Sequence, residues 1–165
     1  MALNIVLVEP EIAVNAGNIA RTCAAIGAKL HLVHPLGFSI TEKQVKRAGL
    51  DYWDKLEIEE HLSFNEFLNK YNPNTENMYF VTTKGKHVYT DVNYNEMDNV
   101  FVLFGKETKG LPEDILKKHL DKTIRIPMRE NLRSLNLSNS VAIVAYEIFR
   151  QNNFGKLEKI SNYFN

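Results

Sequence analysis

Short apolar runs rich in β-branched residues alternate along this chain with stretches of helical periodicity, and this alternation limits the possible folds more than any other feature. The apolar runs cover residues 3–8, 30–33, 78–82, 100–104 and 123–126. The helical stretches cover residues 18–28, 43–49, 64–71, 112–120 and 138–151. Continuous apolar strands separated by helices are typical of a parallel sheet covered on both faces. We therefore predict an α/β domain with a mostly parallel sheet.

The length and composition suit a single intracellular domain. A chain of 165 residues is long enough to fold without disulfides or a metal, and its one cysteine, Cys23, cannot form an internal disulfide. The sequence has no apolar run of about 18 residues and no basic region before its first apolar run. We expect no membrane partner and no secretory signal, and hence a cytoplasmic protein.

The charge balance argues mildly against a nucleic acid partner. Twenty Lys and Arg residues offset twenty Asp and Glu residues, which gives a formal net charge of zero. Proteins that bind nucleic acid usually carry a basic excess. A neutral chain can bind RNA only if its basic side chains gather on one face.

Two of the predicted helices carry clear signals at their ends or along one face. In "GLPEDILKKHL", Pro112 suits the first helical position, acidic residues occupy the first turn and basic residues the last. The last helix places its apolar residues on one stripe: Val141, Val144, Ala145, Ile148 and Phe149.

The first helix is predicted to separate an apolar face from an exposed one. Ile19, Cys23 and Ile26 share a face, whereas Arg21 lies roughly 200° around the axis from Ile19. The preceding "VNAGN" contains Asn and Gly, residue types that cap helices or allow close approach. Arg21 is therefore placed for a function or for simple solvation, and Cys23 is interpreted as a core thiol.

Three loops directly follow predicted strands. They read "TTKGK", "GKETKGLP" and "PMRENLRSLN". If the strands are parallel, all three loops emerge at the carboxyl edge of the sheet, where open α/β folds bind their ligands. This edge is the predicted site.

Common phosphate and metal motifs are missing from these loops and from the rest of the sequence. "GKETKGL" has two glycines at phosphate-loop spacing, but Leu111 stands where a lysine is required, and G-x-G-x-x-G does not occur. His31 and His34 are three residues apart in a strand, so they point to opposite faces and cannot share a metal. We predict no metal and no ligand held by its phosphates.

Three segments of the chain resemble, in order and spacing, the motifs of the SPOUT RNA 2′-O-methyltransferases. They are "EPEIAVNAGNIARTCAAIGAKLHLVHPLGF", "LFGKETKGLP" and "IPMRENLRSLNLSNSVAIVAYE". The resemblance implies a C-terminal trefoil knot over about residues 78–149, S-adenosylmethionine as cofactor and a homodimer. The loss of periodicity after Gly155 separately predicts a loosely docked tail at 155–165. The short length is similar to that of the minimal subfamily, which methylates the wobble cytidine or uridine of tRNA and so binds the anticodon stem-loop.

Site residues follow from the resemblance position by position. It implies that the cofactor is bound by Val81, Gly105, Ile126, Ser134 and Asn136. It implies that Arg21 acts at the methyl-accepting site, where a guanidinium stays protonated and is a poor base, and would instead hold a phosphate and stabilise an alkoxide.

Several assignments stay open on the sequence alone. Asn15 orients Arg21 or caps the first helix, and Glu107 contacts substrate or ties down the loop. Asn136 and Ser138 cap the last helix, pin the cofactor loop, or do both. Tyr146 is assigned to the rim of the dimer and the active site by resemblance, against the alternative of an ordinary core or rim aromatic.

The expected RNA-contacting residues come from the same loops and from the first helix. They are Arg21, Lys106, Lys109, Arg129 and Arg133, with weaker candidates in Lys43, Lys46 and Arg47. Ordinary solvated charge is the alternative for each. The alternative functions are methylation of another tRNA or rRNA position, and a non-catalytic RNA-binding module that keeps the knot.

Overall fold

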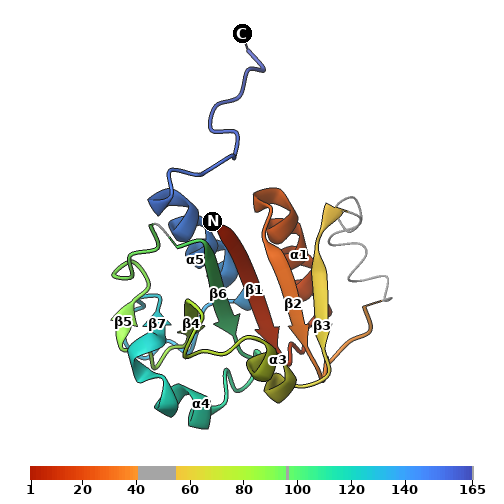
Figure 1. Cartoon of the computed structure of the whole chain (residues 1–165), viewed down its shortest axis with the longest axis vertical. Coiled ribbons are helices and arrows are strands. Elements are labelled where there is room, and N and C mark those ends of the chain that lie inside the picture. Colours follow the sequence, from red (N-terminus) through yellow and green to blue (C-terminus); the bar gives the residue numbers. More distant parts are fainter. Residues whose placement is uncertain (41–54, 96, 165) are drawn as a thin grey trace.

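A seven-stranded parallel sheet forms the centre of the protein. The computed structural model describes residues 1–40, 55–95 and 97–164. The strands are β1 (Ala2–Val8), β2 (Lys29–Val33), β3 (Ile58–His61), β4 (Met78–Val81), β5 (His87–Val88), β6 (Asn99–Phe104) and β7 (Thr123–Arg125). Their order is β3-β2-β1-β6-β4-β7-β5, and every pairing between these strands is parallel (Figure 1). The predicted α/β fold with a parallel sheet is confirmed.

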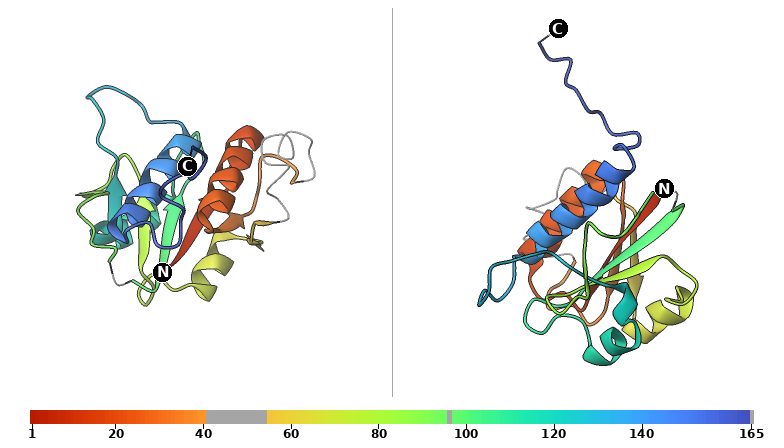
Figure 2. Two further views of the ribbon diagram at one scale, coloured as in Figure 1. Left: turned by 90° about the horizontal axis from the view of Figure 1, so that it is seen from above. Right: turned by 90° about the vertical axis from the view of Figure 1, so that its left-hand side faces the viewer.

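Helices cover both faces of the sheet, as predicted (Figure 2). α1 (Ala13–Ile26) and α5 (Leu137–Gln151) pack on one face, and α3 (Phe64–Lys70) and α4 (Glu113–Lys118) on the other. The alternation of side chains along β1 divides the core accordingly. Ile5 and Leu7 pack with α1 and α5, whereas Val6 and Val8 pack on the face of α3 and α4.

The five predicted strands are all present, but β3 and β5 were missed. β3 reads "IEEH", so its two glutamates hide it from any search for apolar runs, and β5 has only two residues. Four predicted helices are also present. The fifth, over residues 43–49, lies outside the described residues together with Lys43, Lys46 and Arg47.

Two predicted helix starts are wrong. α1 begins at Ala13, five residues before the predicted start, so "VNAGN" lies inside the helix and Asn15 does not cap it. The cap residue, Ile12, makes no side-chain capping bond. Pro112 is the residue before α4 and has extended backbone, with φ −55° and ψ 132°, rather than the first helical residue. As predicted, Ile19, Cys23 and Ile26 are buried and Arg21 is exposed.

The chain after α5 leaves the body of the protein (Figure 1). Asn153, Phe154 and Gly155 all have positive φ, which ends the helix and turns the chain away. Ile160, Tyr163 and Phe164 are almost fully exposed. Within the described part of the chain, no helix combines the length and the apolar character needed to span a bilayer.

Candidate active site

The three predicted loops meet at the carboxyl edge of the sheet and enclose a cavity of about 740 Å³. Its walls come from the ends of β4 and β6 and from the long connection between β7 and α5. All five residues assigned to the cofactor line this cavity: Val81, Gly105, Ile126, Ser134 and Asn136. The volume lies in the range of small-molecule and cofactor pockets.

The cavity combines an apolar slot with short polar groups. Val81, Leu111 and Ile126 supply apolar side chains, while Thr82 and Ser134 supply hydroxyls beside the main chain of the three loops. A flat heteroaromatic ring bound by backbone groups, such as an adenine, suits this lining. Thr82, Leu111 and Met128 were not singled out in the sequence, because nothing distinguishes them until the fold brings them to the cavity.

Gly105 allows the middle loop to fold back on itself. An added Cβ at this position would lie 2.0 Å from the carbonyl carbon of Gly110 and 2.1 Å from the nitrogen of Leu111. The Gly110 N–H donates to the Lys106 carbonyl at 2.8 Å, and Gly110 has φ +70°. Gly105 is therefore required for the close approach of two backbones, rather than merely tolerated in a turn.

Glu107 holds the start of α1 against this loop. One carboxylate oxygen accepts from the Glu11 N–H at 2.8 Å, and the other accepts from the Ile12 N–H at 3.2 Å and from Asn15 Nδ2 at 3.1 Å. Ile12 immediately precedes α1, and its N–H is one of those left unpaired at a helix start, whereas Asn15 in the first turn donates through its side-chain amide. The cap that α1 lacks locally is thus supplied by a residue 95 positions away from Ile12.

Asn15 continues this network to the third loop. Its Oδ1 accepts from Asn136 Nδ2 at 3.0 Å, and Asn136 Oδ1 in turn accepts from the Ser138 N–H at 2.9 Å and the Asn139 N–H at 3.4 Å. Asn136 therefore caps α5, as expected, and also binds Asn15 of α1. Both ends of the Asn15 amide are thus engaged, one by Glu107 and the other by Asn136.

A second set of contacts joins the same two segments. The Glu11 carboxylate accepts from the Thr108 hydroxyl at 2.8 Å and from the Thr108 N–H at 3.0 Å, and these bonds, the hydroxyl first, lower the pKa of Glu11. Lys106 forms an ion pair with Glu9. Lys106 was expected to contact RNA, and in this structure its ammonium is paired with the Glu9 carboxylate beside the cavity.

Of the remaining predicted residues, some line the cavity and others lie outside it. Lys109 and Arg133 line it, and Arg129 is exposed on the connection between β7 and α5. Arg21 is exposed on α1 and is not among the described residues that line the cavity. Tyr146 is 46% exposed on α5.

Replacing Glu107 with Gln is expected to weaken binding of S-adenosylhomocysteine about tenfold. The glutamine amide keeps one acceptor oxygen but turns an NH₂ group toward N–H donors, and each lost charge-assisted bond costs about 1.5–3 kcal/mol. Calorimetry measures the affinity. Glu60→Gln is the matched control, since Glu60 is an exposed carboxylate on β3 that pairs with His34. An unchanged affinity with a lowered melting temperature would show that Glu107 supports only the fold.

Comparison with known proteins places the chain among RNA methyltransferases. Residues 2–146 match the model of the SpoU rRNA Methylase family. A Listeria monocytogenes serotype 4b protein, described as a candidate tRNA (cytidine(34)-2′-O)-methyltransferase, is 50% identical over 164 residues, which cover 99% of this chain and 96% of that protein. The tRNA (cytidine(34)-2′-O)-methyltransferase of Escherichia coli K12 is 45% identical over 150 residues, covering 90% and 93%.

A solved structure gives the same result at the level of the fold. It is described as giving structural insights into the 2-OH methylation of C/U34 on tRNA. It is 41% identical in sequence, covers 92% of this chain and 97% of its own, and superposes with a TM-score of 0.85. The similarity therefore extends over nearly all of both chains and includes the three segments that build the cavity.

Proposed function

The chain belongs to the SpoU rRNA methylase family, and on that premise we propose that it transfers a methyl group from S-adenosylmethionine to the ribose 2′-hydroxyl of the wobble cytidine or uridine of tRNA. The observation that carries the proposal is the 45% identity to the E. coli enzyme of this activity over almost the full length of both proteins. We place this work in the cytoplasm, with the anticodon stem-loop as the substrate.

The cavity described above fits the cofactor. S-adenosylmethionine supplies an electrophilic methyl group on a sulfonium. Val81 and Ile126 would hold its adenine, and Gly105 leaves the backbone open to approach. Ser134 and Asn136 would bound the cavity on the side of α5.

Arg21 would act on the RNA at the methyl-accepting position. A ribose 2′-hydroxyl is a weak acid, so transfer needs the hydroxyl oriented in line and its proton removed. A guanidinium stays charged at any relevant pH and is a poor base, but it binds phosphate bidentately and stabilises a developing alkoxide. We assign these two roles to Arg21, with proton loss to the neighbouring phosphate or to water.

Glu107, Asn15 and Asn136 are then positioning residues. Their hydrogen bonds join the start of α1, the Gly105 loop and the start of α5, which are the three segments that resemble the family motifs. Loss of one bond would shift cavity walls rather than remove a reacting group.

We further propose that the protein works as a homodimer that shares its sites. Arg21 lies on the exposed face of α1 with Val14, which is 50% exposed, and α5 exposes Ile143 and Tyr146 at 37% and 46%. Apolar side chains on neighbouring helices favour a protein partner. In such a dimer, Arg21 of one protomer would complete the cavity of the other.

The trefoil knot over about residues 78–149 is part of the same proposal. β7 lies in the sheet between β4 and β5, although β4 and β5 are adjacent in sequence. The connection between them passes directly against β7. The Thr82 N–H donates to the Ile124 carbonyl at 2.9 Å, and a Cβ at Gly85 would lie 2.5 Å from the Ile124 carbonyl carbon. Such a close crossing supports a chain threaded through its own loop.

The test is methylation of a synthetic anticodon stem-loop by the purified protein. With labelled S-adenosylmethionine and a stem-loop carrying C34 or U34, we expect label in 2′-O-methylated nucleoside at position 34, detected by mass spectrometry. A 2′-deoxy nucleotide at that position should accept none. Label elsewhere in tRNA, or in rRNA alone, would reassign the substrate, and failure to bind the cofactor would indicate a non-catalytic module.

A further inference from the structure

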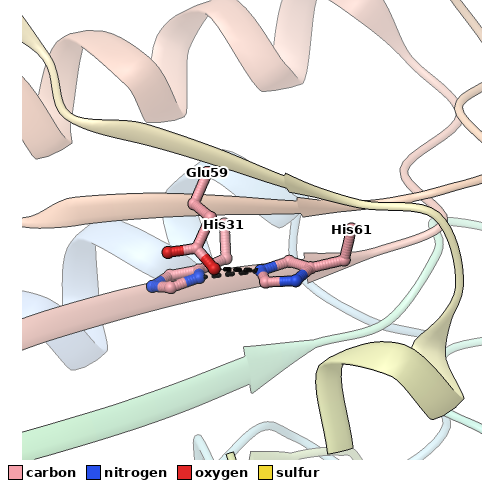
Figure 3. A group of neighbouring side chains, drawn as sticks. All are labelled: His31, Glu59 and His61. Atoms are coloured by element: carbon pink, nitrogen blue, oxygen red, sulfur yellow. Dashed lines mark hydrogen bonds and ion pairs between the residues drawn. The ribbon is translucent and has the colours of Figure 1, made fainter. Parts of the chain in front are cut away.

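Two histidines from neighbouring strands lie side by side in the core, away from the proposed active site (Figure 3). His31 on β2 is 0% exposed and His61 on β3 is 2% exposed. His31 Nδ1 lies 3.0 Å from His61 Nε2, and the ring planes are 12° apart. The apolar pattern does not predict β3, so His34 is the only nearby histidine that the sequence suggests as a partner of His31.

Neighbouring groups determine which nitrogens carry protons. Asn4 Nδ2 donates to the Val100 carbonyl at 3.2 Å, and a carbonyl can only accept, so the other end of the amide is Oδ1. That oxygen lies 3.1 Å from His31 Nε2, which must therefore be protonated. In neutral His31, Nδ1 is then an acceptor, and His61 Nε2–H donates to it. Hydrogen bonds run in one direction from His61 through His31 to Asn4.

This pair supports the packing of α3 and β3. Phe67 and Tyr71 pack against both imidazole rings, with centroid distances from His31 of 5.8 and 5.4 Å. Phe67 is the one residue of α3 that is buried. Among the described strands, β3 pairs with β2 alone. The histidines are therefore a principal contact between this edge and the rest of the sheet.

Charged side chains around the pair act on it in both directions: the Glu59 and Glu66 carboxylates favour proton uptake, whereas the Lys29 and Lys70 ammonium groups oppose it. Glu59 Oε1 lies 3.5 Å from His61 Nε2, but Glu59 is already paired with Lys29 at 2.9 Å and Lys70 at 2.7 Å. Glu66 and the Tyr71 hydroxyl face the cluster from α3.

Lys29 and Lys70 also argue against a metal ion at this cluster. Single ligand atoms of His31, Glu59 and His61 lie within 4.8 Å of one another, a spacing that a metal ion can bridge. A dication there would sit beside two ammonium groups and compete with them for one carboxylate. The contacts therefore favour a hydrogen-bonded neutral pair.

We propose that the His31–His61 pair makes the β3–α3 edge acid-sensitive, so that proton uptake by the pair releases β3 and α3 from the sheet while the methyltransferase site remains folded. The first added proton, at His61 Nδ1 or at His31 Nδ1 with a change of the His61 tautomer, places a cation among buried aromatic rings. A second sets two N–H groups against each other at the 3.0 Å contact. Both changes weaken the contacts that hold α3.

The direction of the pH dependence follows from the pKa values. Burial lowers the pKa of His31 from 6.5 to about 4, and burial also lowers the pKa of His61. The released state binds protons with the ordinary pKa, so the stabilisation is complete above about pH 6.5 and is lost as the pH falls toward 4. From pH 7 to pH 5, His31 alone should raise the released fraction about twentyfold.

Hydrogen exchange of the intact protein at pH 7 and pH 5, corrected for intrinsic rates, tests the proposal. Amides of residues 58–70 should exchange about twentyfold faster at pH 5, whereas those of β6 should not change. His34→Gln, which alters a half-buried histidine that pairs with Glu60 at the same edge, should keep the pH difference of the wild type. Replacing both His31 and His61 by Leu should remove the pH difference.

Imidazole NMR titration of the wild-type protein keeps the proposal falsifiable if the double variant does not fold. Of the five histidines, His31 should resist protonation until below pH 5, and His61 should take up its proton at a lower pH than an ordinary imidazole. Ordinary titration of all five, or equal acceleration of exchange in β6 and β3, would overturn the proposal. A rise in melting temperature with Zn²⁺ that His61→Gln abolishes would instead identify a metal site.

Discussion

Replacing Arg21 with Ala is expected to lower the rate of methyl transfer at least about a hundredfold while leaving the affinity for S-adenosylhomocysteine near that of the wild type. Arg21 is exposed on α1 and is not one of the described residues lining the cavity, so cofactor binding should not depend on it. Removing a group that holds the phosphate and stabilises the alkoxide should act on the chemical step. Single-turnover methylation of the anticodon stem-loop measures the rate, and calorimetry measures the affinity.

Arg21→Lys and Arg129→Ala are the matched controls. Lysine keeps the charge but loses bidentate binding, so it should restore only part of the rate. Arg129 is an exposed arginine on the neighbouring connection, and its loss should weaken RNA binding more than it slows transfer. A rate within a fewfold of the wild type in Arg21→Ala would contradict the assigned role.

Replacing Gly105 with Ala is expected to remove measurable cofactor binding. The added methyl group would lie 2.0 Å from the carbonyl carbon of Gly110 and 2.1 Å from the nitrogen of Leu111. Both are backbone atoms, which cannot rotate away as a side chain could. The loop must open, which displaces the middle wall of the cavity. Overpacking of this kind costs about 3 kcal/mol, so the melting temperature should also fall.

Gly110→Ala is the control within the same loop, because it separates the effect of a steric clash from the effect of backbone strain. Gly110 has φ +70° and no atom within 4 Å of an added Cβ, so alanine there meets backbone strain but no clash. A cost of about 1–2 kcal/mol and retained cofactor binding are expected. If both variants bind equally well, steric closure at Gly105 does not shape the site.

Arg21→Ala and Gly105→Ala together also test the shared site of the proposed dimer. Neither variant should be active alone. In a mixed dimer, one cavity would keep an intact Gly105 loop and receive an intact Arg21 from the other protomer. Recovered methylation after co-expression or subunit exchange is the expected result, and its complete absence would indicate independent sites.

The sequence predicted those features that depend on local periodicity. Five apolar runs identified five strands, and the alternation with helices identified the parallel sheet and the edge at which the loops meet. The prediction was wrong where the local sequence pattern is not typical of the element that forms. β3 carries Glu59 and Glu60 in a strand, and "VNAGN" lies within α1, where Glu107 from another part of the chain accepts from the Ile12 N–H just before the helix and from the Asn15 side chain.

The sequence by itself determined the fold class, the edge of the sheet where the three loops meet and, through three ordered motifs, the chemistry to test. Tertiary structure alone decided what the polar side chains do. Asn15, Glu107 and Asn136 are linked by bonds that span 92 and 121 residues, and His31 meets His61 across 30. Periodicity records which face of an element is buried, because burial follows the local repeat. Hydrogen bonds between distant residues depend on how the elements pack, and no local pattern encodes that.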